Sequence, residues 1–215
     1  MNTSLKSTSL KPAPLKCRKA LVAAAVTAAA LLTAACGGSD SKSTNASATT
    51  VTSSAAAATT VVDSSKPTDT GNLSAAFDHI AGYELAELPA SDLQSARDQY
   101  QSEVSGNAAA QKAVSDINGR LVSKEGAKVA VVLAMSFSPD ASTQPGFQAA
   151  FVEGAAGSDA SPVTLSGEDA KTFTQSDGTE GVVFAKGRLG LLVIGAGGNS
   201  TQLQDVMSKL IGNNA

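Results

Sequence analysis

The chain has 215 residues, of which 42% are hydrophobic and 16% charged, and its formal net charge at pH 7 is −3. The acidic excess lies in residues 71–215, which contain nine basic and sixteen acidic side chains. Because neutralising phosphates needs clustered lysine and arginine, this composition argues against a nucleic-acid partner and against docking on anionic lipid through a basic patch.

The first 35 residues have the parts of an export signal. Five basic residues and no acidic one occupy positions 1–19, and a thirteen-residue apolar run follows at 20–32. As a helix, this run would span roughly 20 Å, less than the ~30 Å hydrocarbon core of a bilayer. Its length therefore predicts a cleaved signal peptide rather than a permanent membrane span.

The end of this segment, Leu32-Thr33-Ala34-Ala35-Cys36, resembles the lipobox of bacterial lipoproteins. In that family the cysteine receives a diacylglycerol, a signal peptidase of type II cuts before it, and further acylation, for instance with palmitate, can follow. The resemblance implies a signal peptide at 1–35 and a lipid on Cys36 that anchors the protein to the cell membrane, facing the extracytoplasmic side. Thr33 departs from the pattern, which usually has leucine there. The alternative is an ordinary secretory signal with an incidental cysteine.

Lipidation has a chemical consequence, because Cys36 and Cys17 are the two cysteines of the chain. Cys17 lies in the signal peptide and leaves with it. A mature protein acylated at Cys36 has no free thiol, which excludes disulfides, thiolate catalysis and cysteine-ligated metals.

Residues 36–70 are predicted to be a disordered tether after the lipidated cysteine. Serine, threonine and alanine dominate this segment without apolar periodicity, so it buries too little apolar surface to offset its ordering entropy. As a flexible coil it would span roughly 30 Å. Such stalks are common substrates of O-glycosylation, and an unmodified spacer is the other interpretation. The stalk and the Ala/Gly-rich domain resemble small lipoproteins of high-GC Gram-positive bacteria, although the type of envelope stays open.

Residues 71–215 are predicted to form a single α+β domain, a mainly antiparallel sheet of about five to seven strands packed by three to four helices. In its first half, the patterns predict a strand at 83–88 and helices at 90–104 and 108–117. A hairpin follows with arms at 121–124 and 128–137, and 129–135 is apolar on both faces, as in a covered central strand.

The second half repeats this order. A helix is predicted from Thr143 to about Gly154, then a strand at 163–165, a hairpin with arms at 170–175 and 179–186, a strand at 189–194 and a helix at 200–211. Two Ser-Thr-Gln triplets, at Ser142 and Ser200, precede the predicted helices. They indicate an internal repeat or a coincidence in a Ser/Thr-rich chain.

The chain shows no recognisable catalytic, cofactor-binding or metal-binding pattern. The glycine-rich loop 195–200 lacks the dinucleotide fingerprint, and His79 is the only histidine. The sequence does not place three acidic pairs across a cleft from one another, and it shows no base for three serines. These residues are Glu84 with Glu87, Glu168 with Asp169, Asp177 with Glu180, and Ser136, Ser138 and Ser166. No cofactor is predicted, and the protein is not expected to be an enzyme.

The leading hypothesis is a lipid-anchored extracytoplasmic protein that binds a partner in the cell envelope. A carrier of a small apolar ligand or lipid is the first alternative, since many small core residues could leave a cavity. An enzyme of unrecognised type is the second alternative. The oligomeric state is not predicted.

Overall fold

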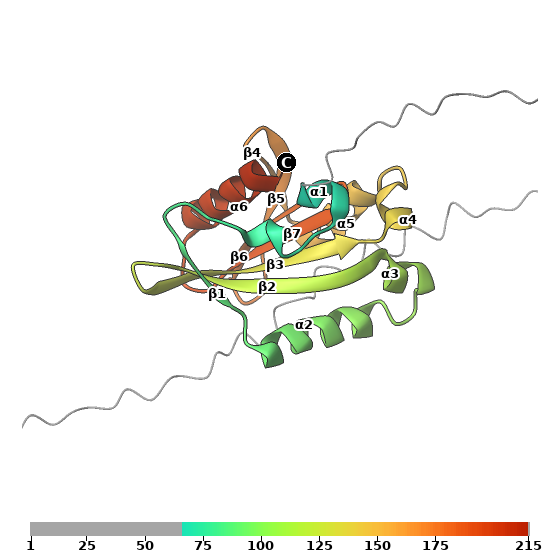
Figure 1. The fold of residues 1–215 in the computed structure, drawn as a ribbon, viewed down its shortest axis with the longest axis horizontal. Helices are drawn as coiled ribbons and strands as arrows, with labels where there is room; N and C mark the ends of the chain where they lie inside the picture. Colours follow the sequence, from blue (N-terminus) through green and yellow to red (C-terminus); the bar gives the residue numbers. More distant parts are fainter. Residues whose placement is uncertain (1–65, 215) are drawn as a thin grey trace, which may run out of the picture.

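The computed structural model describes residues 66–214, which form one antiparallel seven-stranded sheet flanked by helices (Figure 1). The predicted α+β class and sheet type are confirmed. Cys36, the signal peptide and most of the predicted tether lie outside the described residues. The sheet order is β1-β2-β3-β7-β6-β5-β4. The strands are β1 (Glu84–Glu87), β2 (Val114–Lys124), β3 (Ala127–Phe137), β4 (Ser161–Leu165), β5 (Glu168–Thr174), β6 (Glu180–Lys186) and β7 (Leu189–Gly195).

Three longer helices and several short ones pack on the sheet. The helices are α1 (Pro67–Thr70), α2 (Ala90–Glu103), α3 (Ala108–Ala113), α4 (Pro139–Ser142), α5 (Phe147–Ala156) and α6 (Ser200–Asn214), with a 3₁₀ turn, η3 (Ala75–Phe77). The one-turn helices α1 and α4 were not among the predicted elements. Each begins with proline, whose fixed φ favours a first helical turn, and the Ser138 side chain caps α4 by accepting from the Ala141 N–H.

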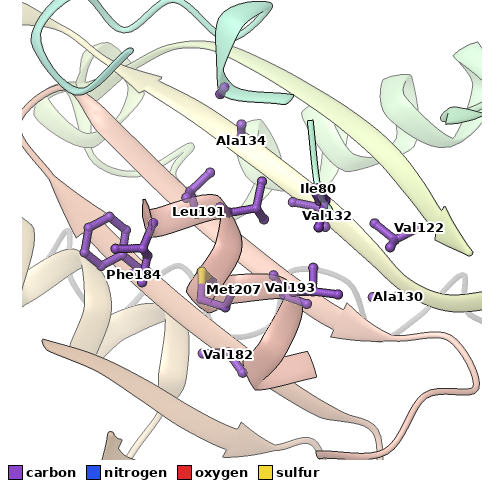
Figure 2. Packing of buried hydrophobic residues seen from close by; sticks show 14 of the residues in the cluster. Ile80, Val122, Ala130, Val132, Ala134, Val182, Phe184, Leu191, Val193 and Met207 are labelled. Carbon is purple, nitrogen blue, oxygen red and sulfur yellow. The ribbon is translucent and has the colours of Figure 1, made fainter. Parts of the chain in front are cut away.

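The sheet is buried on both faces. Helices α2 to α5 cover one face, and α6 with η3 covers the other (Figure 1). Leu133 and Met135 of β3 belong to the first core cluster, whereas Val132 and Ala134 belong to the second. The second cluster converges on Met207 of α6 (Figure 2). The prediction of a central strand covered on each side at 129–135 is therefore confirmed.

The helix predicted at 108–117 is wrong beyond Ala113, because β2 begins at Val114. Val114 and Ile117 pair with the far end of β3, so a long hairpin overrides the local helical pattern. Gly119 does not end a helix. It lies in β2 where a Cβ would come within 3.0–3.1 Å of Leu133 and Leu88 side-chain atoms.

The helix predicted from Thr143 is wrong at its start. The one-turn helix α4 ends at Ser142, and α5 begins only after Gly146, which has a left-handed φ of 78°. Gly154 lies inside α5, and the chain leaves the helix at Gly157. The first Ser-Thr-Gln triplet therefore begins on the last residue of α4, while the second begins α6, so the two triplets do not support an internal repeat.

The predicted boundary at residue 70 also needs correction, because α1 belongs to the folded part. Pro67 and Thr68 are buried, and the Arg188 N–H donates a 2.7 Å hydrogen bond to the Thr68 carbonyl. Gly187 allows this approach, since a Cβ there would lie 2.2 Å from the Thr68 oxygen. The folded part therefore includes residues 67–70, and the predicted tether is shorter by these four residues.

Candidate functional site

A surface hollow of about 640 Å³, here called the α5–β4 groove, lies where the sheet extends beyond α5. Its lining combines small apolar side chains with three charged ones. The lining residues are Gln148, Ala149, Val152 and Glu153 of α5, Pro162, Val163 and Thr164 of β4, Asp169, Ala170 and Lys171 of β5, and Ala185 of β6.

The groove exists because α5 covers β6 and β5 but not β4. Phe151 of α5 packs in one cluster with Phe173 of β5 and Val183 of β6. On the opposite face, Leu165 of β4 is buried in the α6 cluster. Strand β4 is therefore covered by α6 on one face, and Pro162 is exposed on the other. Pro162 pairs with Lys171, and Lys171 pairs with Val183, so Pro162 lies on the α5 side of the sheet.

The charges of the groove do not cancel. Lys171 Nζ lies 2.5 Å from Glu153 Oε1, which joins β5 to α5 in an ion pair whose glutamate is exposed and whose lysine is half-buried. Asp169 lies on the same face of β5, two residues before Lys171, and no described cation forms an ion pair with it. One exposed carboxylate is therefore free to meet a cationic group of a ligand.

The glycine-rich loop before α6 serves packing. The Ala196 and Gly198 N–H groups donate to the Val129 carbonyl, at 2.9 and 3.0 Å. A Cβ at Gly197 or Gly198 would lie 2.8 Å from a carbonyl oxygen of Lys128 or Val129. The glycines thus let the loop lie against β3.

The start of α6 is not a favourable phosphate site. Asn199 and Gln202 cap it reciprocally: the Gln202 N–H donates to Asn199 Oδ1 at 3.0 Å, and the Asn199 N–H to Gln202 Oε1 at 3.1 Å. Asp177 and Glu180 line the adjoining hollow of about 360 Å³. The hydrogen bond from the Thr179 backbone lowers the pKa of the Asp177 carboxyl, which keeps it anionic and opposes a phosphate.

The other residues considered as functional candidates from the sequence lie outside the α5–β4 groove. His79 is exposed, and its carbonyl accepts from Asn213. Ser138 caps α4, and the Ser166 hydroxyl bonds to Ser208. Glu168 pairs with Lys186 at 2.7 Å on the α6 side of the sheet, opposite Asp169. Among residues 66–214, no three Asp, Glu, His or Cys side chains gather as a metal site.

One cluster was missed from the sequence, because it joins residues far apart in the chain. The Tyr83 hydroxyl donates a 2.9 Å hydrogen bond to Asp205 Oδ2, and Lys209 Nζ lies 2.8 Å from the same oxygen. Lys124 and Lys209 lie 5.7 and 5.0 Å from the centre of the Tyr83 ring. These contacts tie the segment before β1 to α6 and the β2–β3 hairpin.

The two tyrosines of the chain should lose their phenol protons over the same pH range, above the range of a free tyrosine. Burial, with the Asp205 carboxylate, raises the pKa of Tyr83 to about 12, and burial raises that of Tyr100 to about 12. Since folding favours the protonated phenols, stability should fall as the pH rises from 10 to 12. We expect absorbance at 295 nm to show little tyrosinate at pH 10.5 in the folded protein and substantially more in urea. Equal tyrosinate fractions in the two states would contradict this assignment.

Comparison with protein-family models, curated proteins and solved structures found no match. Within residues 66–214, none of the helices combines the length and apolarity that crossing a membrane requires. The fold and the groove therefore define an α+β domain with an open hollow at one end of its sheet.

Proposed function

We propose that this protein is a membrane-anchored extracytoplasmic lipoprotein whose folded part has a non-catalytic role and binds an envelope partner at the α5–β4 groove. The observation that carries the binding role is the groove itself, a hollow with apolar walls and a few charged groups on rigid elements, as binding sites commonly have. The anchor rests on the lipobox resemblance at Cys36. A tether after Cys36 would let the domain reach its partner away from the lipid.

Two of the small core residues do not favour the carrier alternative. A Cβ at Gly190 would lie 2.6 Å from the Phe137 ring, and one at Gly181 would lie 2.2 Å from the Phe173 ring. Phenylalanine rings thus occupy the space that these two glycines leave, so small core residues at these positions serve close packing.

The partner is best sought by crosslinking at the groove. A photoreactive amino acid replaces Ala149, an exposed groove residue, in the full-length protein in its own cells. The same amino acid at Ala109, an exposed alanine of α3 outside the groove lining, is the matched control. We expect an adduct with a specific envelope protein from position 149 and not from 109, identified by mass spectrometry of the crosslinked peptide. Identical or absent adducts at both positions would contradict the proposal.

A further inference from the structure

Strand β4 is an edge of the sheet beside the α5–β4 groove. The β4–β5 hairpin closes through Ser166 and Gly167, both with positive φ, between the paired residues Leu165 and Glu168. In such a two-residue hairpin the pair next to the turn is hydrogen-bonded, and bonded pairs then alternate along the strands. The backbone groups of Thr164 and Pro162 therefore point away from β5, to the outer edge.

This edge offers a short and specific set of hydrogen-bonding groups. Thr164 presents one N–H and one carbonyl, whereas Pro162 presents a carbonyl alone because proline has no N–H. A strand that pairs there antiparallel would exchange two hydrogen bonds with Thr164 and donate one to Pro162.

The negative charge of Asp169 determines which side chain an added strand would place in the α5–β4 groove. On the α5 side of the sheet, Thr164 pairs with Asp169, so an added residue opposite Thr164 lies two strands from Asp169. Neighbouring strands are about 4.8 Å apart, which puts the Asp169 backbone roughly 10 Å away. Only a long cationic side chain both reaches across this distance and complements the Asp169 carboxylate.

Building on the proposed groove function, we propose that β4 binds an extended peptide as an added antiparallel strand, with a lysine or arginine directed at Asp169. The same face of the peptide meets Pro162 two residues further on. Because the added strand runs antiparallel to β4, this second residue follows the basic one in the peptide and packs on the exposed proline ring. The recognised pattern is a basic residue, any residue, then an apolar residue, in an extended segment of the partner.

A second copy of this chain fits the edge less well. Pairing two β4 edges about Val163 places each Thr164 opposite a Pro162, and the two prolines supply no N–H for the reciprocal bonds. The pairing also brings two acidic grooves together, since each has an unpaired Asp169. The edge is thus disfavoured for self-association and open to a basic partner.

A direct test uses the full-length protein in detergent micelles and fluorescein-labelled heptapeptides. The probe alternates threonine and valine around a central lysine, and the matched peptide has glutamate at the centre. Fluorescence anisotropy should show the lysine peptide binding about tenfold more tightly, roughly the difference that 1.4 kcal/mol produces. In Asp169→Lys the preference should reverse, which a misfolded variant would not do.

Two further variants examine the backbone pairing. Thr164→Pro removes the outward N–H without touching the β4–β5 bonds and should weaken lysine-peptide binding about tenfold. Thr164→Val keeps the N–H and should bind the lysine peptide about tenfold more tightly than Thr164→Pro. Thermal melting checks that both remain folded.

Four outcomes would overturn strand addition: no binding of the lysine peptide, unchanged peptide binding in Thr164→Pro, no reversal in Asp169→Lys, or a dimer of the native protein that Thr164→Pro dissociates. Failure of the lysine peptide to bind, with partner adducts still formed at position 149, would reject strand addition and leave the proposed function standing. Absence of those adducts would instead reject the proposed function.

Discussion

Replacing Cys36 with alanine is expected to abolish acylation, leave the precursor uncleaved and remove lipid-mediated retention in the membrane. Buried acyl chains contribute about 0.8 kcal/mol per CH₂, so two chains hold a protein on a bilayer almost irreversibly. The apolar run at 20–32 is too short to replace them, because as a helix it spans only roughly 20 Å. Incorporation of labelled palmitate, phase partitioning in a cloud-point detergent and the size of the product measure these three effects.

The chain provides a matched control in Cys17, the only other cysteine. Because Cys17 lies within the basic start of the predicted signal peptide, Cys17→Ala should be acylated, cleaved and retained like the native protein. Detergent-phase partitioning of Cys36→Ala at the native level would refute lipidation at this residue. Loss of acylation in both variants would show that the assay does not distinguish the two cysteines.

Phe137→Ala should destabilise the domain by about 3–5 kcal/mol. Phe137 is fully buried at the end of β3, and its ring centre lies 4.9 Å from those of Phe147 and Phe151 in edge-on contacts. Truncation would leave a cavity between β3 and α5. Urea denaturation of the full-length protein, followed by circular dichroism, measures the change in the free energy of unfolding.

Gly190, which lies against the Phe137 ring, allows a second test of this packing. Gly190→Ala places a Cβ 2.6 Å from the Phe137 ring and should destabilise by about 1–3 kcal/mol through overpacking. In a Phe137→Leu background the crowding is relieved, so the same glycine substitution should cost less. Strict additivity of the two changes would show that residues 137 and 190 do not share this space.

The hairpins that join β2 to β3 and β5 to β6 were predictable because their signals are local. Glu125-Gly126 joins β2 to β3, with φ of 52° and 76°, and Asp177-Gly178 lies between β5 and β6. A tight turn between two apolar runs needs residues that tolerate positive φ, and these residues are contiguous in the chain. The apolar face of α6 was visible for the same reason, since its helical spacing needs no distant partner.

Two of the errors arose where distant pairing decided the conformation. Residues 114–117 have a helical pattern beside α3 but pair with the end of β3. Residues 67–70 look like tether, yet Thr68 is fixed by Arg188, more than a hundred positions away. In each case tertiary hydrogen bonds and burial outweighed a local preference of a few tenths of a kcal/mol per residue.

The groove could not be predicted either. Glu168 and Asp169 are adjacent in the sequence, but one pairs with Lys186 and the other lines the α5–β4 groove. Their separation follows from the two-residue period of β5, and the importance of Asp169 follows from where α5 stops across the sheet. That position depends on the packing of Phe151 against Phe173 and Val183, which no short motif encodes.

Three properties of this protein follow from composition or from neighbouring residues alone: the lipobox resemblance at Cys36, the acidic balance of residues 71–215 and the α+β pattern. The pairing of β3 with β7, the edge position of β4 and the groove that α5 leaves beside β4 depend on the packing of the whole domain. Strand order and helix placement are chosen by the burial of side chains from distant segments in one core, and this information is distributed over the whole domain.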